Sequence, residues 1–169
     1  MNSSSVEIVE MDADRRERFL ASQAGTYAES LFRSGAFGSS EEASERARQQ
    51  LKSILAMESE EQFFFRVIAL NGATPLETGP KATSGEVGVL WWTVRKPARS
   101  AWIYDIAISQ EFRRRGFARA ALQELEKWCR KHSCPQIGLN VFAFNSGAEK
   151  LYREMGFEDI SKQMRKLLS

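Results

Sequence analysis

The nine residues 101–109, Ala-Trp-Ile-Tyr-Asp-Ile-Ala-Ile-Ser, are apolar at almost every position. When extended, such a segment presents apolar side chains on both faces, which is typical of an interior strand in a sheet that helices cover. A polar turn follows at once, and apolar residues then recur with the 3.6-residue period of a helix over 115–132. This succession predicts a helix-covered sheet with residues 101–109 near its centre.

The same two periods and the turn formers between them give the other expected elements. Asp12 and Asp14 are candidate N-caps of a first helix, and Ser39 with Glu42 forms a capping box for a second. Residues 71–85 are turn formers throughout and are expected to form a mobile hairpin loop within one domain, 1–169. The expected strands are 6–11, 63–70, 86–94, 101–109, 137–142 and a closing strand over 157–168, whole or broken in two, with a third and a fourth helix at 115–132 and 145–155. The prediction is an α/β fold with a mixed sheet of six to seven strands and about four helices.

Length and composition exclude several classes of protein. The chain has 169 residues, of which 43% are hydrophobic and 27% charged, as in one globular domain. It has no apolar run of about 18 residues, and its polar first residues lack the apolar core of a secretory signal, so we expect a cytoplasmic protein with no membrane partner. One His and two Cys are too few for a zinc site of the usual kind, and no metal is expected.

Charge is unevenly distributed along the chain. The net charge is +2, but the first 61 residues carry 12 acidic and 7 basic side chains, whereas the remainder carries 10 and 17. This asymmetry fits a cationic substrate on the acidic part and an anionic ligand on the basic part, and it also fits an ordinary solvated surface.

A basic turn lies between the central strand and the third helix. It reads Gln-Glu-Phe-Arg-Arg-Arg-Gly-Phe-Ala over residues 110–118. The start of a helix offers unpaired backbone N–H groups and a positive dipole end, and small residues let a ligand approach the main chain. Three arginines at that end oppose the dipole unless an anion neutralises them, so the turn predicts a phosphate site. It matches neither a Walker A loop nor a dinucleotide-binding fingerprint.

The turn resembles the pyrophosphate loop of the GNAT superfamily of acetyl-CoA-dependent N-acetyltransferases, [Gln/Arg]-x-x-Gly-x-[Gly/Ala], at Arg113, Gly116 and Ala118. A second block, 145–157, is similar to the family's N-x-x-A-x-x-L-Y-x-x-x-G-F element and begins 32 residues after Arg113. The resemblance is close over 102–157 and extends to the first hundred residues only in element order. It implies a sheet that is splayed between its fourth and fifth strands.

The resemblance also implies where acetyl-CoA would bind. The main chain at Ile106, Ala107 and Ile108 would pair with the pantetheine arm in the splay, and the turn would cradle the pyrophosphate. Asn145 would hydrogen-bond the pantetheine arm, or cap the last helix, or do both. The residues expected at the pyrophosphate are Arg113, Arg114, Arg115, Gly116, Phe117 and Ala118.

The resemblance implies that Tyr152 is the general acid that protonates the departing CoA thiolate. The alternative role of Tyr152 is an aromatic residue of the core, because it falls on the apolar stripe of its helix. The family's motifs do not fix the base that must deprotonate an amine with a pKa near 10. Asp105 is a candidate because an unpaired carboxylate on a central strand is costly, so it faces the substrate cleft or pairs with an arginine.

The first two helices wall the acceptor site in this fold. Tyr27 and Glu29 are therefore candidate substrate-binding residues, although Glu29 also fits a solvated helix face. The acidic excess of these helices predicts that amines with two or more positive charges are preferred. The expected partner is a small-molecule or peptide amine, and dimers are common in the family, so a homodimer is an option.

The leading hypothesis is an enzyme that moves an acetyl group from acetyl-CoA to a primary amine by direct attack in a ternary complex. The alternative is a catalytically silent acyl-CoA-binding module of the same fold, which would need the cradle but no acid. Nucleic-acid binding ranks last, because the arginine run is three residues long and the other basic residues are scattered.

Overall fold

The protein is described by a computed structural model, which covers residues 5–57, 61–70, 85–166 and 168. Residues 71–84 of the expected hairpin loop lie outside the described residues. No helix within the described ranges is long and apolar enough to cross a membrane.

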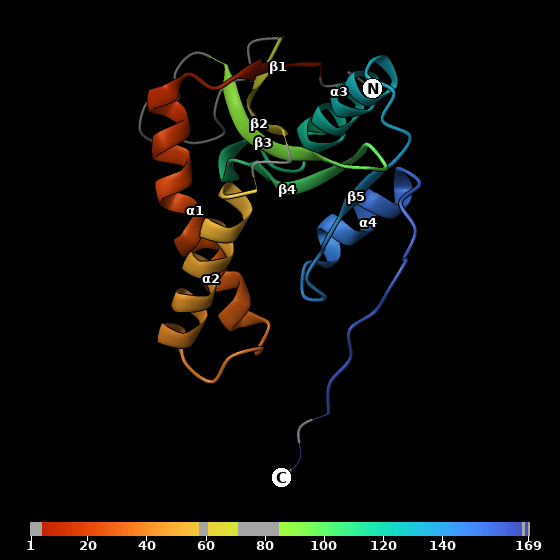
Figure 1. The fold of residues 1–169 in the computed structure, drawn as a ribbon. Coiled ribbons are helices and arrows are strands. Elements are labelled where there is room, and N and C mark those ends of the chain that lie inside the picture. The colour runs from red at the N-terminus through yellow and green to blue at the C-terminus, as the bar shows by residue number, and fades with distance from the viewer. Residues whose placement is uncertain (1–4, 58–60, 71–84, 167, 169) are drawn as a thin grey trace.

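One mixed sheet of five strands forms the centre of the fold (Figure 1). The spatial order of the strands equals their sequence order, because antiparallel hairpins join the first four in turn. The last pair, β4 and β5, is parallel, and helix α3 makes the crossover between them. The strands are β1 (Val6–Glu10), β2 (Glu61–Ala69), β3 (Glu86–Arg95), β4 (Ser100–Ile108) and β5 (Ile137–Leu139).

In the described part of the chain four α-helices flank this sheet, in agreement with the prediction of about four. Helix α1 (Ala13–Arg33) begins at Asp12, whose side chain accepts from the Arg15 amide at 2.7 Å. Helix α2 (Ser40–Leu55) begins at Ser39, which accepts from the Glu42 amide at 3.2 Å. Asp12 and Ser39 are thus confirmed as N-caps, whereas the other candidate, Asp14, lies within the first turn of α1. Figure 1 shows α1 and α2 side by side, with α3 (Phe117–Lys131) and α4 (Ser146–Glu154) lying apart from them.

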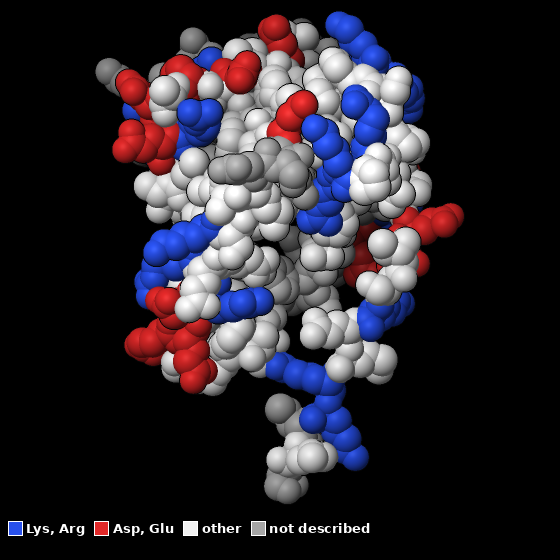
Figure 2. Space-filling model, viewed as in Figure 1, with Lys and Arg blue, Asp and Glu red and all other residues white. Residues whose placement is uncertain are grey.

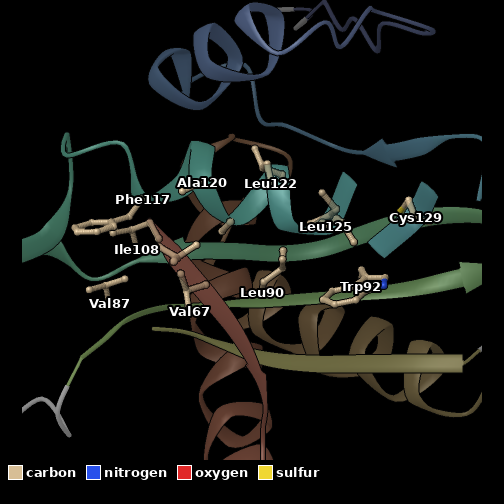
Figure 3. Close-up of a cluster of buried hydrophobic side chains, with 14 of the residues drawn as sticks. Val67, Val87, Leu90, Trp92, Ile108, Phe117, Ala120, Leu122, Leu125 and Cys129 are labelled. Carbon is tan, nitrogen blue, oxygen red and sulfur yellow. The ribbon is translucent and has the colours of Figure 1, made fainter. Parts of the chain in front are cut away.

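Aromatic residues divide between the two faces of the sheet. Trp92 is fully buried on the face that α3 covers and stacks on Phe63 and Phe65, with ring centroids 5.3 and 4.7 Å apart. Its neighbour Trp91 points the other way and packs with Phe19 of α1, at 6.0 Å. Figure 3 shows the larger cluster between the strands and α3. The alternation of a strand thus buries both faces and fixes which side chains of β4 face α1.

Strands β4 and β5 are paired only at one end. The register joins residues 101–103 to Ile137–Leu139, and β4 then continues to Ile108 without a β5 partner. The splay that the family resemblance implied is confirmed. Strand β5 is shorter than the expected 137–142 because the chain leaves the sheet at Asn140.

The predicted closing strand over 157–168 is wrong, and so is the expected count of six to seven strands. Among the described residues of this segment none is in a strand, and Ile160 and Met164 are 81% and 90% exposed. Its apolar residues recur every three or four positions, so no two-residue alternation offers an apolar face to a sheet. Side-chain contacts hold it instead, from Arg153 to Asp159 at 2.9 Å and from Arg165 to the Ser34 carbonyl at 3.0 Å.

The close approach of β3 and β4 requires glycine at position 88. A Cβ there would lie 2.8 Å from Ile108 Cδ1 and would overlap the Ala107 carbonyl oxygen. We expect Gly88→Ala to lower the free energy of unfolding by about 1–3 kcal/mol, as overpacking does. The matched control is Gly25→Ala in α1, where no atom lies within 4 Å of the added Cβ. Alanine there should raise the free energy of unfolding by about 0.5–1 kcal/mol. Urea unfolding measures both free energies, and a change of the same sign and size in the two variants would contradict the packing argument.

Candidate active site

The turn between β4 and α3 presents a row of unpaired backbone donors. A short 3-10 turn, η1 (Gln110–Phe112), leads into Arg114 and Gly116, both in the left-handed region at φ 61° and 82°. In the described chain no group accepts a hydrogen bond from the amides of Arg114, Gly116, Phe117 or Ala118. Free amides at a helix start, with left-handed residues among them, form a concave donor surface that suits a phosphate.

The three predicted arginines spread apart from this turn. Arg113 donates from Nε to the Ile108 carbonyl at 3.0 Å, and Arg115 lies over the Phe117 ring, 5.4 Å from its centroid. The guanidinium of Arg114 reaches the first turn of α4, where a Cβ on Gly147 would lie 3.7 Å from it. The cradle therefore consists first of main-chain amides, and Arg114 connects it to α4.

The unpaired end of β4 carries the three residues predicted to contact pantetheine. Ala107 is exposed, Ile106 is half-buried and Ile108 is buried, and all three follow the last β4–β5 pair. The Ile108 carbonyl already accepts from Arg113, so the open main chain lies before it. On the other side of the splay, Asn145 caps α4 by accepting from the Ala148 amide at 3.3 Å. Its capping role is confirmed, and its ligand role stays a prediction.

Asp105 lies where β4 bulges. Trp91 is paired with Asp105 but Trp92 with Ile103, which leaves Tyr104 as the extra residue. Such a bulge turns side chains away from the regular pleat. The Asp105 carboxylate points to α1, where its Oδ2 accepts from Gln23 Nε2 at 2.9 Å. Of the two arrangements expected, pairing with an arginine is absent among the described residues.

Burial dominates the ionisation of both predicted catalytic residues. It raises the pKa of Asp105 to about 6, against the opposing effect of hydrogen bonds from Gln23 and from the Ile106 amide. It also raises the pKa of Tyr152 to about 12, with a further contribution from the negative charge of Asp105. The two groups therefore lie close enough to interact electrostatically. The Tyr152 hydroxyl makes no hydrogen bond with any described residue, although its ring packs on Phe157.

An aromatic group borders α1 opposite β5 and α4. The Tyr27 hydroxyl donates to Gln50 Oε1 at 3.2 Å, and its ring lies 6.2 Å from Phe142. Phe142 stacks on Phe144 at 5.3 Å, and Arg33 lies 4.4 Å from the Phe144 ring centroid. The sequence analysis did not identify Phe142, Phe144 or Arg33 as residues of this site. The Phe-Ala-Phe alternation directly before Asn145 could have indicated the two phenylalanines.

Glu29 is exposed on α1 and lies about 200° around the helix from Tyr27, so the two predicted acceptor residues are not brought together. Figure 2 shows a central hollow with Lys and Arg side chains beside it, whereas acidic side chains gather where α2 begins. The preference for polycationic amines stays a prediction, which this distribution does not favour. The described residues contain no group of three or more His, Cys, Asp or Glu side chains that could hold a metal ion.

Comparison with known proteins identifies the family. The sequence profile described as "Acetyltransferase (GNAT) family" matches residues 29–157. The uncharacterized N-acetyltransferase YycN of Bacillus subtilis (strain 168) is 36% identical over 84 residues, which are 48% of this chain and 54% of that protein. In sequence, the chain thus spans about half the length of this curated relative.

Solved structures share the whole fold. The crystal structure of the B. subtilis acetyltransferase YycN superposes with a TM-score of 0.80 at 24% identity, over 98% of this chain and 99% of that one. The acetyltransferase AAC(6')-Iy, solved with the bisubstrate analogue CoA-S-monomethyl-acetylneamine, gives a TM-score of 0.56 at 14% identity, over 98% and 99%. The profile match, the relative and these folds agree with the splayed sheet and its turn of free amides, and the chain belongs to the acetyltransferase (GNAT) family.

Proposed function

We propose that the protein transfers an acetyl group from acetyl-CoA to a primary amine by direct attack in a ternary complex. The observation that carries this proposal is the position of Asp105, a half-buried carboxylate with a pKa raised to about 6, at the splay and within electrostatic reach of Tyr152. A carboxyl that is ionised at neutral pH and a phenol that stays protonated suit a base and an acid.

The free amides of the β4–α3 turn would hold the pyrophosphate, and the open main chain at Ile106 and Ala107 would pair with pantetheine. An acetyltransferase of this fold, AAC(6')-Iy, has been solved with a CoA bisubstrate analogue, which supports this placement of the donor. Asp105, which is ionised above pH 6, would accept the proton of the incoming ammonium. The amine nitrogen then forms a bond to the acetyl carbon, the carbon–sulfur bond breaks, and the thiolate takes the proton of Tyr152. The nitrogen, which still carries one proton too many for an amide, gives it to the Tyr152 phenolate, and Asp105 releases its own proton to water.

Burial does not disqualify Tyr152 as the acid. A pKa of about 12 makes a weak acid for a thiolate whose thiol has a pKa near 8.5 in water. Desolvation penalises any anion, however, so it also raises the pKa of a thiol that is removed from water. The proton affinity of the departing thiolate would therefore rise together with that of Tyr152 where both are desolvated.

The deciding experiment is a thiol-release screen with acetyl-CoA against a library of primary amines, including amino acids, polyamines, aminoglycosides and peptides. Turnover with at least one class supports the proposal. Tight acetyl-CoA binding by calorimetry without turnover on any class would favour the silent acyl-CoA-binding module instead.

The main-chain cradle is tested with Gly116→Glu. The new carboxylate would stand where the pyrophosphate is expected, so acetyl-CoA affinity should fall by at least about tenfold because like charges repel. Since Gly116 has a φ of 82°, Gly116→Asn is the control, because asparagine tolerates this conformation and adds no charge. Calorimetry should show a smaller loss for the Asn variant, and an unchanged affinity in the Glu variant would refute the cradle.

Tyr152→Phe tests the acid. The ring still packs on Phe157, so stability should change little, while the proton for the thiolate is lost. We expect kcat to fall by roughly 10- to 1,000-fold, within the usual range of general acid catalysis, with acetyl-CoA affinity nearly unchanged. A variant that turns over at the parent rate would make Tyr152 a core aromatic only.

Asp105→Asn tests the base and its energetic cost. We expect kcat/KM to fall by about 10²–10⁴-fold. Because the pKa of Asp105 is raised from 3.8 to about 6 in the folded state, the protein loses stability as pH rises through that range and the buried carboxyl ionises. The Asn variant should therefore melt a few degrees higher than the parent at pH 8 and show no such gain at pH 4. Melting curves at the two pH values measure this, and a lower Tm at pH 8 would contradict the assigned burial cost.

A further inference from the structure

Gln23 of α1 donates a hydrogen bond to the Asp105 carboxylate. Among the described residues, no other side chain does so. The two residues are 82 positions apart, so the contact exists only in the folded protein. Gln23 is half-buried and donates from Nε2 to Oδ2 at 2.9 Å, a normal length for such a bond. The bond fixes the position of Oδ2, and a carboxylate has about four acceptor sites, so it can still accept a proton from a further partner.

The surroundings of Asp105 supply little other charge. Strand β3 contributes Trp91, which is neutral, and α4 contributes the phenol of Tyr152. On β4 the neighbouring Tyr104 lies under the guanidinium of Arg95, 5.8 Å from its ring centroid. Helix α1 contributes the neutral Gln23. Gln23 is thus the side chain that most directly favours the ionised carboxylate, together with the Ile106 amide.

Gln23 and Tyr27 are four residues apart and therefore lie on one face of α1. Tyr27 is bonded to Gln50 of α2 and contacts Phe142 across from the helix pair. The same helix face thus carries both the contact to Asp105 and part of the aromatic border of the expected acceptor site. A shift of α1 on acceptor binding would change both together.

We propose that Gln23 is a positioning residue, which holds the Asp105 carboxylate through Oδ2 in the orientation that receives the amine proton, and which couples the charge state of the base to the position of α1. This inference rests on the proposed function for the identity of the base. The hydrogen bond itself, and its effect on the ionisation of Asp105, do not.

The test is Gln23→Met, which keeps the length of the side chain and removes the donor. Loss of a hydrogen bond to a charged group should raise the midpoint of Asp105 by about one pH unit, as read from the titration of its carboxyl carbon by NMR in the free protein. The matched control, Gln49→Met, changes an exposed glutamine of α2 that bonds Glu45 and should leave the midpoint unchanged. An unchanged midpoint in Gln23→Met overturns the proposal.

Turnover gives a second readout that a merely structural role would not produce. The acid limb of the kcat/KM profile should move up by the same unit in Gln23→Met, and most of the activity should return at high pH, where Asp105 is ionised in both proteins. A loss of equal size at every pH would overturn the proposed coupling of Gln23 to the charge state of Asp105. If the parent acetylates no amine, the proposed function fails, and the NMR titration still decides on Gln23.

A second variant guards against a folding defect. In Gln23→Glu two carboxylates would share the site, so the pair should titrate in two steps, the upper one well above the parental midpoint. A Glu variant that titrates at the parental pH would show that position 23 does not contact Asp105, and would overturn the proposal independently of the Met variant.

Discussion

The parting of β4 from β5 is the constraint on which the rest of the site depends. A strand in the middle of a covered sheet normally satisfies its main chain on both sides, since unpaired buried amides and carbonyls are costly. Here pairing stops after Ile103 and Leu139, and β4 runs on for five residues with one open edge. Arg113 satisfies the Ile108 carbonyl of this edge, and a ligand with its own amide groups, such as an extended pantetheine arm, has the chemistry to pair with the main chain before it. The same opening places the β4–α3 turn and the start of α4 on opposite sides of one gap.

The burial of both sheet faces explains how a carboxylate comes to stand at this opening. Trp92, Leu90 and their neighbours fill the face below α3, so the regular pleat leaves the other face of β4 to α1. The bulge at Tyr104 then changes the register beside Trp91 and directs Asp105 at α1, not into the aromatic core. Packing on one face thus determines the chemistry available on the other.

Sequence reasoning predicted those parts of the molecule that depend on local pattern or on a motif. The N-caps at Asp12 and Ser39 and the glycine-containing turn between β4 and α3 follow from short-range chemistry, and the structure has them. The prediction of a closing strand was wrong because a strand must pair with the edge of a sheet, and the described residues of 157–168 do not. The lack of a two-residue alternation in this segment was a sign against a strand. Gln23 was missed because its meaning comes from a contact across 82 residues. The sequence analysis placed Phe142 at the end of an expected strand and did not consider Phe144. Their place beside the expected acceptor site is visible only in the structure, which brings Phe142 to Tyr27.

The choice of a neutral partner for Asp105 has a physical consequence for catalysis. An arginine or lysine in place of Gln23 would offset more of the free energy that desolvation of the carboxylate costs. It would also lower the pKa of the carboxyl by about 1–3 units and make it a weaker base. With no partner at all, burial would raise the pKa further and leave the group protonated over more of the neutral range. A glutamine amide supplies one hydrogen bond without a charge, which keeps the pKa near 6, close to working pH yet ionised at neutrality. In the proposed mechanism this destabilising carboxylate is useful, because a weaker desolvation penalty would also make Asp105 a weaker base.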